Sequence, residues 1–175
     1  MFVNLKKLDK SSNKYFIKLS DRNFIRILSE NNITLNSDYD FLAEIALSLK
    51  GLRLTAQVKL KTSVILECGR CLNTYNYNIN ETLNLIYVPS ESDKDAGASG
   101  GKKNIELKEE EMDIGYYDDN SVDLYNIFIE AVNLLIPLNP LCSHDCKGLC
   151  PSCGADLNKK KCTCTGRNTI IYNYN

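Results

Sequence analysis

The sequence predicts an α+β protein in which one main helix packs on an antiparallel β-sheet and a cysteine-rich module follows at the C-terminal end. Two observations lead to this prediction. Polar and apolar residues alternate over two long neighbouring segments, as in paired strands with one buried face. Six of the eight cysteines lie between residues 142 and 164. Because closely spaced thiolates are good ligands for Zn²⁺, we expect this module to bind zinc.

Length and charge limit the architecture and the partners. The 175 residues are enough for one domain with a real core and a small appended module. The net charge of −1 argues against a surface that binds polyanions throughout. The charge is unevenly distributed, since acidic residues dominate 91–123 whereas 1–90 and 142–175 carry an excess of basic residues.

We therefore divide the chain at residue 141. Residues 1–141 are expected to form the sheet domain, with a flexible acidic insert at 90–120 and the helix at 122–136. Residues 142–175 are expected to form the metal-binding module, packed on the tip of the sheet.

The cellular compartment decides how the eight cysteines are interpreted. The N-terminus lacks the apolar run and cleavage site of a secretory signal, and no stretch approaches the ~20 apolar residues of a membrane span. We therefore expect a cytoplasmic protein with no membrane partner. Because cytosolic thiols are held reduced, metal ligation is favoured over structural disulfides and over unrelated free thiols.

The first 46 residues carry a weak signal. Short apolar groups at 15–17 and 24–28 are separated by polar residues, which favours short strands over helices. The segments 31–32 and 36–38, rich in Asn, are typical of turns.

The strongest periodicity runs from Leu52 to Cys68 and resumes from Tyr75 to Tyr87. Apolar residues occupy the even positions in the first segment and the odd positions in the second. This pattern predicts two long strands that pair as a hairpin, each with one buried face. Cys68 and Cys71 then lie at the hairpin tip, where both sulfurs can project from one end of the sheet.

A loop and a helix are expected next. Residues 90–120 are rich in glycine and charge, which is typical of a flexible solvated loop. Ser121 is expected to cap a helix whose apolar positions recur every three or four residues, and Pro137 ends it. The chain then enters Cys142 directly, so the helix can place the cysteine module beside the hairpin tip.

Eight cysteines make two tetrahedral sites without remainder. Pro151 and Gly154 favour a tight turn around one Cys-x-x-Cys pair, because the glycine is free to take a positive φ. The simplest partition gives a local site of Cys150, Cys153, Cys162 and Cys164. The other site takes Cys68, Cys71, Cys142 and Cys146, and closes a loop of roughly 70 residues, which should stabilise the fold appreciably.

Two Zn²⁺ ions per chain are expected at these zinc-ribbon-like sites. Iron in a rubredoxin-like Cys₄ site is the alternative, because tetrahedral sulfur coordination does not distinguish the two metals. His144 is either a replacement ligand for one cysteine or a plain exposed histidine. With every cysteine ligated, no open position remains for an activated water, so the sites are expected to be structural.

Several motifs occur in a fixed order over roughly residues 50–164. They are Glu67-Cys-Gly-Arg-Cys-Leu72, Val122-Asp-Leu124, Pro137-Leu-Asn-Pro-Leu-Cys142, and Cys146-Lys-Gly-Leu-Cys-Pro-Ser-Cys-Gly-Ala-Asp-Leu-Asn158 with the two cysteines that follow. Together they resemble the YceD family, the large ribosomal RNA subunit accumulation proteins, and the Cys-Lys-Gly-Leu-Cys-Pro stretch is quite specific. The resemblance implies a non-enzymatic bacterial or plastid protein that supports large-subunit ribosomal RNA accumulation in ribosome assembly.

We accordingly expect ribosomal RNA or large-subunit assembly components as partners. Cations in or beside the cysteine loops are the candidate phosphate contacts, although composition alone favours solubilising charges. They are Arg70, Lys147, Lys159, Lys160, Lys161 and Arg167. Tyr75 and Tyr77 could stack on bases, but their alternation favours core packing.

Two other classes of function stay open. A protein-binding module would dock its acidic insert onto a basic partner. A thiol redox protein would use Cys68 and Cys71, and would need reactive thiolates rather than ligated ones. Nucleophilic hydrolysis is poorly supported, because His144 is the only histidine.

Overall fold

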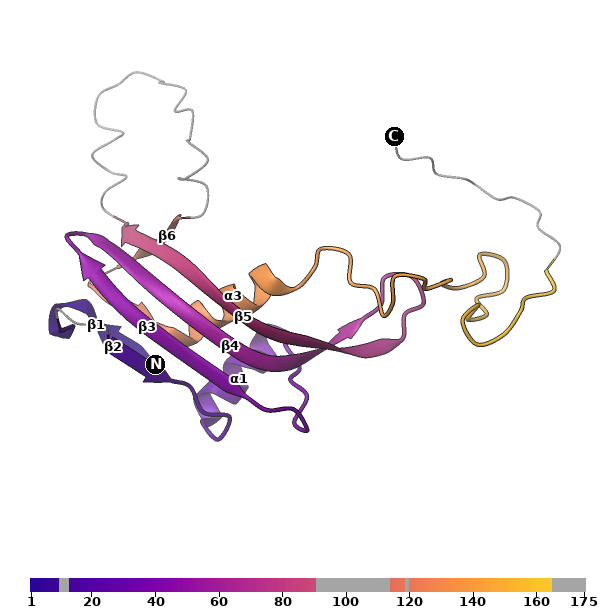
Figure 1. Ribbon diagram of the computed structural model, residues 1–175, viewed down its shortest axis with the longest axis horizontal. Helices are drawn as coiled ribbons and strands as arrows, with labels where there is room; N and C mark the ends of the chain where they lie inside the picture. Colours follow the sequence, from indigo (N-terminus) through magenta and orange to yellow (C-terminus); the bar gives the residue numbers. More distant parts are fainter. Residues whose placement is uncertain (10–12, 91–113, 119, 165–175) are drawn as a thin grey trace, which may run out of the picture.

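The computed structural model describes residues 1–9, 13–90, 114–118 and 120–164. A five-stranded sheet dominates them, in the order β2-β3-β4-β5-β6 (Figure 1). Neighbouring strands are antiparallel except β5 and β6, which are parallel. The strands are β2 (Asn13–Phe16), β3 (Leu42–Lys50), β4 (Arg53–Glu67), β5 (Thr74–Pro89) and β6 (Ile114–Tyr117).

The long hairpin predicted from the alternation is confirmed as β4 and β5. Their pairing runs from Leu54 opposite Tyr87 to Glu67 opposite Thr74, so the tip holds Cys68 and Cys71. β3 pairs with β4 only as far as Lys61. The last six residues of β4 therefore extend with β5 beyond the rest of the sheet, by about 20 Å. This extension is what brings the hairpin tip to the cysteine module.

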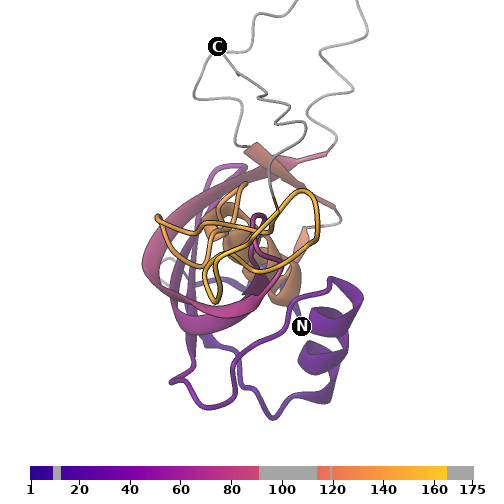
Figure 2. The same ribbon diagram turned by 90° about the vertical axis from the view of Figure 1, so that its right-hand side faces the viewer.

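The two helices lie on one side of the curved sheet (Figure 2). They are α1 (Arg22–Glu30) and α3 (Leu124–Leu135). Phe24 of α1 and Phe128 of α3 are fully buried and meet edge to face, with ring centroids 4.9 Å apart. Apolar side chains of β4 at alternate positions, such as Val58 and Leu60, complete this core.

The α1 helix corrects the expectation of short strands in this part of the chain. Asp21 caps it, since its carboxylate accepts hydrogen bonds from the backbone N–H of Asn23 and Phe24. Phe24 and Leu28, one helical turn apart, are its buried residues. The cap and this spacing were present in the sequence, but the neighbouring Ile25 and Ile27 obscured the helical period.

The main helix was predicted with the correct type and different ends. Ser121 is not its cap, because Ser121–Asp123 form β7, which pairs with β1 (Phe2–Asn4). Asp123 is the N-cap, and its carboxylate accepts from the backbone N–H of Tyr125 at 3.1 Å. The helix ends at Leu135 because Ile136, which precedes Pro137, is extended as a residue before proline usually is.

A short 3-10 turn η1 (Leu5–Lys7) follows β1. The segment expected as a flexible acidic insert, 90–120, contains β6, which the sequence did not predict. Its residues 91–113 and 119 lie outside the described residues. Across the described part of the chain, no helix is both long and apolar enough to cross a bilayer.

Candidate metal centres

The eight cysteines gather into two groups of four. Within each group all four sulfurs lie within 4.8 Å of one another. We call Cys68, Cys71, Cys142 and Cys146 the tip group, and Cys150, Cys153, Cys162 and Cys164 the loop group. This grouping is the one expected from the spacing.

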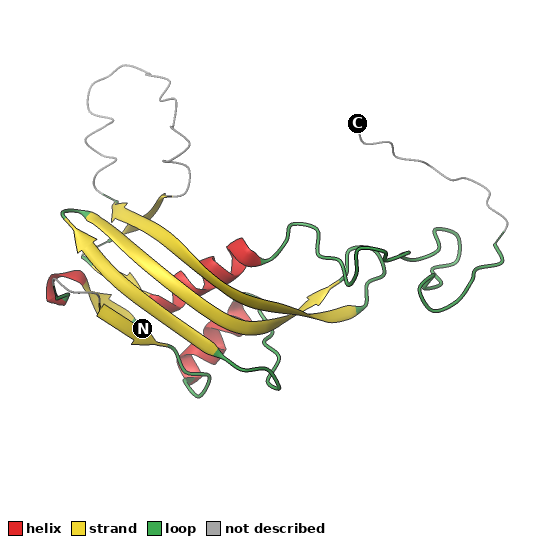
Figure 3. Cartoon of the chain, in the orientation of Figure 1, coloured by secondary structure: helices red, strands yellow, loops and turns green. Residues whose placement is uncertain are grey.

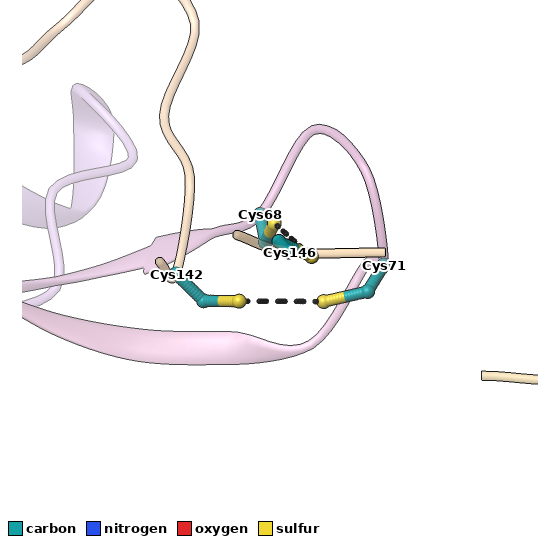
Figure 4. A group of neighbouring side chains, drawn as sticks. All are labelled: Cys68, Cys71, Cys142 and Cys146. Carbon is teal, nitrogen blue, oxygen red and sulfur yellow. Dashed lines mark hydrogen bonds between the residues drawn. The ribbon is translucent and has the colours of Figure 1, made fainter. Parts of the chain in front are cut away.

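The tip group joins the hairpin to the chain that leaves α3. Figure 4 shows its four side chains pointing toward a common centre. The Sγ atoms of Cys68 and Cys146 are 3.8 Å apart, and those of Cys71 and Cys142 are 3.7 Å apart. Three of the four residues are buried, and Tyr75, Leu141 and Leu149 pack against them.

Backbone contacts hold the two halves of the tip group together. Gly69 N–H donates to the carbonyl of Pro140 at 2.8 Å, and Leu149 N–H donates to the carbonyl of Arg70 at 3.1 Å. The Arg70 guanidinium donates to the carbonyl of Cys146 at 3.1 Å. Gly148 has a φ of +70°, and a Cβ there would lie 3.0 Å from the Arg70 carbonyl oxygen. Only glycine fits this turn without strain.

The loop group lies further along the module, which is built of loops and turns (Figure 3). The Cys162 sulfur is 3.3 Å from that of Cys150 and 3.6 Å from that of Cys153. Gly154 takes a φ of +69°, as the turn predicted, and its N–H donates to the carbonyl of Cys150 at 2.8 Å. This group is more exposed than the tip group, because only Cys150 is buried.

Residues between Cys153 and Cys162 connect the two groups. Asn158 donates from Nδ2 to the Cys146 sulfur at 3.4 Å, and its Oδ1 accepts from Lys147 N–H at 2.8 Å. Asn73 of the hairpin tip donates from Nδ2 to the Cys71 sulfur at 3.3 Å. Asp156 accepts from both amides, at 2.8 Å from Asn73 and 2.9 Å from Asn158. Such contacts orient metal ligands and tune their basicity.

One thiol in each group has a strongly lowered pKa. The pKa of Cys68 is lowered to about 6 despite the burial of this residue. The main cause is a hydrogen bond with the backbone of Cys142. Backbone N–H groups of Ser152 and Cys153 lower the pKa of Cys150 to about 6. Each group therefore already favours one thiolate at neutral pH.

A second thiol in each group is held in its neutral form. Desolvation of its sulfur, followed by hydrogen bonding to the neighbouring sulfurs, raises the pKa of Cys142 to about 12. Hydrogen bonding to Cys162 raises the pKa of Cys164 to about 12. Four thiolates this close repel one another, so the full ionisation of either group requires a cation to neutralise it.

The distances fit a tetrahedral metal ion better than disulfides. Four sulfurs at ~2.3 Å from one Zn²⁺ are separated by about 3.8 Å, close to the spacings in the tip group. A disulfide needs about 2.05 Å. The two cysteine groups can therefore hold metal ions, with the ligand type that zinc and iron accept.

The other candidates from the sequence are placed as follows. His144 is fully exposed and belongs to neither group within the described chain. Tyr75 and Tyr77 are half-buried, and the Tyr77 hydroxyl donates to the Leu135 carbonyl at 3.2 Å, so packing is their role here. Cys68 has no exposed surface, which disfavours it as a reactive thiol.

The candidate phosphate contacts have differing surroundings. Arg70 is engaged in holding the module, and the Lys159 ammonium lies 3.6 Å from Asp156. Lys147, Lys160 and Lys161 are exposed, and Arg167 lies outside the described residues. Their contact with RNA stays a prediction.

The residues that the sequence did not single out are polar. Asn73, Asp156 and Asn158 contact the sulfurs or each other. Their position inside the motif-bearing stretches was visible, but an Asn or Asp in a turn is more often explained by the turn itself. Gly148 was equally visible, although its close approach to Arg70 depends on the fold.

A family model described as large ribosomal RNA subunit accumulation protein YceD matches residues 56–169 of this chain. The chain belongs to the YceD family. The match includes all eight cysteines and the polar residues Asn73, Asp156 and Asn158. No solved structure matches the chain.

Relatives of this YceD protein come from bacteria and plants. A Mycobacterium tuberculosis protein described as uncharacterised is 33% identical over 91 residues, which are 52% of this chain and 39% of the relative. A Zea mays homologue named as a chloroplastic large ribosomal RNA subunit accumulation protein is 31% identical over 126 residues, 62% of this chain and 43% of its own. Its Arabidopsis thaliana counterpart is 28% identical over 134 residues, 66% and 40% of the two chains. The chain spans less than half the length of these relatives.

Proposed function

We propose that this protein is a non-enzymatic, zinc-stabilised factor that supports the accumulation of large-subunit ribosomal RNA by binding RNA or a ribosomal component. Membership of the YceD family is the observation that carries the proposal. The plant relatives are named for the same process. In a cell without plastids, the protein would act in the cytoplasm.

The ligands of the first proposed Zn²⁺ are the four cysteines of the tip group, and those of the second are the four of the loop group. Four sulfur ligands fill a tetrahedral ion, so neither ion would keep an open position for water. The ion in the tip group would fasten the hairpin to the chain after α3. The metals would thus build a rigid surface rather than carry out a reaction.

Elemental analysis of protein purified without added metal tests the metal assignment. We expect two zinc ions per chain. A Cys71→Ser variant and a Cys153→Ser variant should each lose one ion and keep the other, because they belong to different groups. Iron in place of zinc, or a metal-free protein whose eight thiols titrate freely with Ellman's reagent, would contradict the assignment.

Binding to ribosomal RNA tests the functional proposal. The zinc-loaded protein should retain large-subunit ribosomal RNA transcribed in vitro in a filter-binding assay. Its affinity should fall steeply as salt rises, since phosphate contacts release counterions. A Lys147→Gln/Lys160→Gln/Lys161→Gln variant tests the exposed lysines of the module. An affinity that does not change with salt concentration would argue against phosphate recognition.

A protein partner is the second form of the same proposal. Pull-downs from an extract treated with nuclease separate the two forms, because a ribosomal protein or assembly enzyme would survive the removal of RNA. Retention of such a protein by wild-type chain, and its loss on deletion of residues 91–113, would favour docking through the acidic insert. Loss of every partner after nuclease treatment would favour RNA.

A further inference from the structure

The strands of the sheet present a second face opposite the helices. Both helices pack on the concave side, and within the described residues no element covers the convex side (Figure 2). In β4 the odd-numbered side chains Arg53, Gln57 and Lys59 point this way, since Leu54, Val58 and Leu60 between them are fully buried. The pairing register places Lys50 directly opposite Arg53 and Asn84 opposite Gln57 on the same face.

The cations of this face are not all neutralised. Lys14 pairs with Glu44 at 2.8 Å, and Lys61 pairs with Asp40 at 2.8 Å. Lys50, Arg53 and Lys59 are exposed and make no ion pair with the described residues. Lys50 and Arg53 lie at the β3–β4 turn, and Lys59 lies near the middle of the face, opposite Glu44. Because Glu44 and Asp40 already pair with Lys14 and Lys61, the face carries an excess of three positive charges, although the whole chain has a net charge of −1.

Amide side chains lie between these cations and further along the same face. Gln57 and Asn84 are hydrogen-bonded across the strands at 3.4 Å, and Asn78 and Asn80 follow along β5. Amides donate to phosphate oxygens and can both donate to and accept from ribose 2′-hydroxyls. A sugar-phosphate backbone offers an anionic phosphate and a hydroxyl in every nucleotide, and this mixture of cations and amides fits that repeat.

We propose that the convex face of the sheet binds the phosphate backbone of RNA through Lys50, Arg53 and Lys59, with Gln57 and Asn84 as neutral hydrogen-bonding partners. Arg53 and Lys59 are six residues apart on one strand, which is about 20 Å. The face therefore spans several consecutive phosphates. It reads no sequence, because its contacts go to the backbone. This inference rests on the proposed function and gives it a contact surface outside the cysteine module.

A salt titration with matched variants tests the proposal. The probe is large-subunit ribosomal RNA transcribed in vitro, and all proteins are full-length and zinc-loaded. The first variant, Lys50→Gln/Arg53→Gln/Lys59→Gln, removes the three charges of the convex face. The control, Lys18→Gln/Arg22→Gln/Arg26→Gln, removes three exposed charges in and before α1, on the other side of the sheet. Both variants have the same net charge.

Log affinity falls as log salt rises, and we expect the convex-face variant to make this negative slope shallower by about 2 to 3. The variant should also weaken binding at low salt by roughly tenfold or more. The control should bind as the wild type does. Circular dichroism and thermal melting establish that each variant is folded. Should the triple variant not fold, the single variants Arg53→Gln and Lys59→Gln should each make the salt slope shallower by about 1.

Three results would overturn the proposal, and each has a different meaning. If the convex-face variant binds like the wild type while Lys147→Gln/Lys160→Gln/Lys161→Gln loses affinity, RNA binding stands and the module alone makes the contact. If the wild type does not bind the RNA at any salt concentration, the convex face and the proposed RNA-binding function fail together. Equal losses in the convex-face variant and in the control would also overturn it, since net charge alone would explain them.

Discussion

Single polar residues decide how the sulfurs are arranged. Asn73 and Asn158 each place an N–H on a cysteine sulfur of the tip group, and Asp156 holds both amides. Such contacts orient the sulfurs that could hold a metal ion. Gly148 allows the module to approach the hairpin backbone. These four residues turn a set of cysteine spacings into one defined geometry.

Replacing Gly148 by alanine should destabilise the contact between the module and the hairpin. The new methyl group would meet the Arg70 carbonyl oxygen at 3.0 Å, in addition to the cost of about 1 to 2 kcal/mol for a positive φ. Gly51→Ala is the matched control, because Gly51 has a φ of +62° and nothing within 4 Å of a new Cβ. Thermal melting of the zinc-loaded proteins should show a larger loss for Gly148→Ala. Equal losses would show that the contact adds no strain.

Replacing Asn158 by aspartate should weaken metal binding at the tip group by about 10-fold or more. The aspartate keeps the oxygen that accepts from Lys147 N–H but replaces the donor to the Cys146 sulfur with a negative charge. Asn80→Asp, on the exposed face of β5, is the control for the added charge. Competition with a chromophoric chelator measures the affinity. An unchanged affinity would mean that the hydrogen bond does not tune the site.

At the scale of elements, the unequal lengths of the strands create the site. β4 and β5 continue past the end of β3, and their tip meets the chain after α3 (Figure 1). α1 packs through Phe24 against α3, which fixes the helix that leads to the module. The N-cap of α1 also contacts α3, because the Tyr125 hydroxyl donates to Asp21. The cap thus joins local helix formation to tertiary packing.

The contribution of Asp21 to the stability of the fold should depend on pH. The hydrogen bond from Tyr125 is the main cause that lowers the pKa of Asp21 below its ordinary value of 3.8. A carboxyl with a lowered folded pKa stabilises the fold above the unfolded value, and this stabilisation is lost as pH falls through the folded pKa. Asp21→Asn keeps a capping oxygen and removes the charge.

We therefore expect Asp21→Asn to lower Tm at pH 7 and the difference from the wild type to shrink below pH 3.8. Metal loss in acid would affect both proteins, so the comparison uses their difference in Tm. Asp38→Asn, in an exposed turn, is the control. A difference that stays constant across this range would show that the charge of Asp21 does not contribute.

At the scale of the whole molecule, the two cysteine groups differ in the length of chain that they close and in their burial. The tip group joins residues more than 70 positions apart and is mostly buried, whereas the loop group closes a short segment and is mostly exposed. Closing a long loop removes more unfolded-state entropy than closing a short one. The tip group should therefore support the whole fold, and the loop group mainly its own segment.

Cysteine variants in the two groups should differ in their effect on stability. Cys142→Ser should lower Tm markedly and increase hydrogen exchange at the hairpin tip, because it breaks the long-range closure. Cys164→Ser removes another exposed cysteine, this one from the loop group, and should leave hydrogen exchange in β4 and β5 unchanged. A chelator added to the wild type should reproduce both effects. Equal destabilisation by the two variants would contradict this division.

Local pattern accounts for much of the fold and of the site. The hairpin follows from alternation over two segments, the main helix from its apolar spacing, and the partition of the cysteines from the distances along the chain. Each of these depends on residues that are near one another in sequence, or on the count of four ligands per ion. The α1 helix was missed because tertiary packing of Phe24 and Leu28 outweighed an ambiguous local signal.

The sequence by itself determined that two long strands pair and that eight thiols form two sets of four, because periodicity and ligand spacing act over short distances. Only the tertiary structure decided that β6 joins the sheet in parallel, that Asp156 and Asn158 reach the hairpin tip, and that Lys50, Arg53 and Lys59 share an uncovered face. Those arrangements depend on strand register and on the packing of distant segments, which no short stretch of residues encodes.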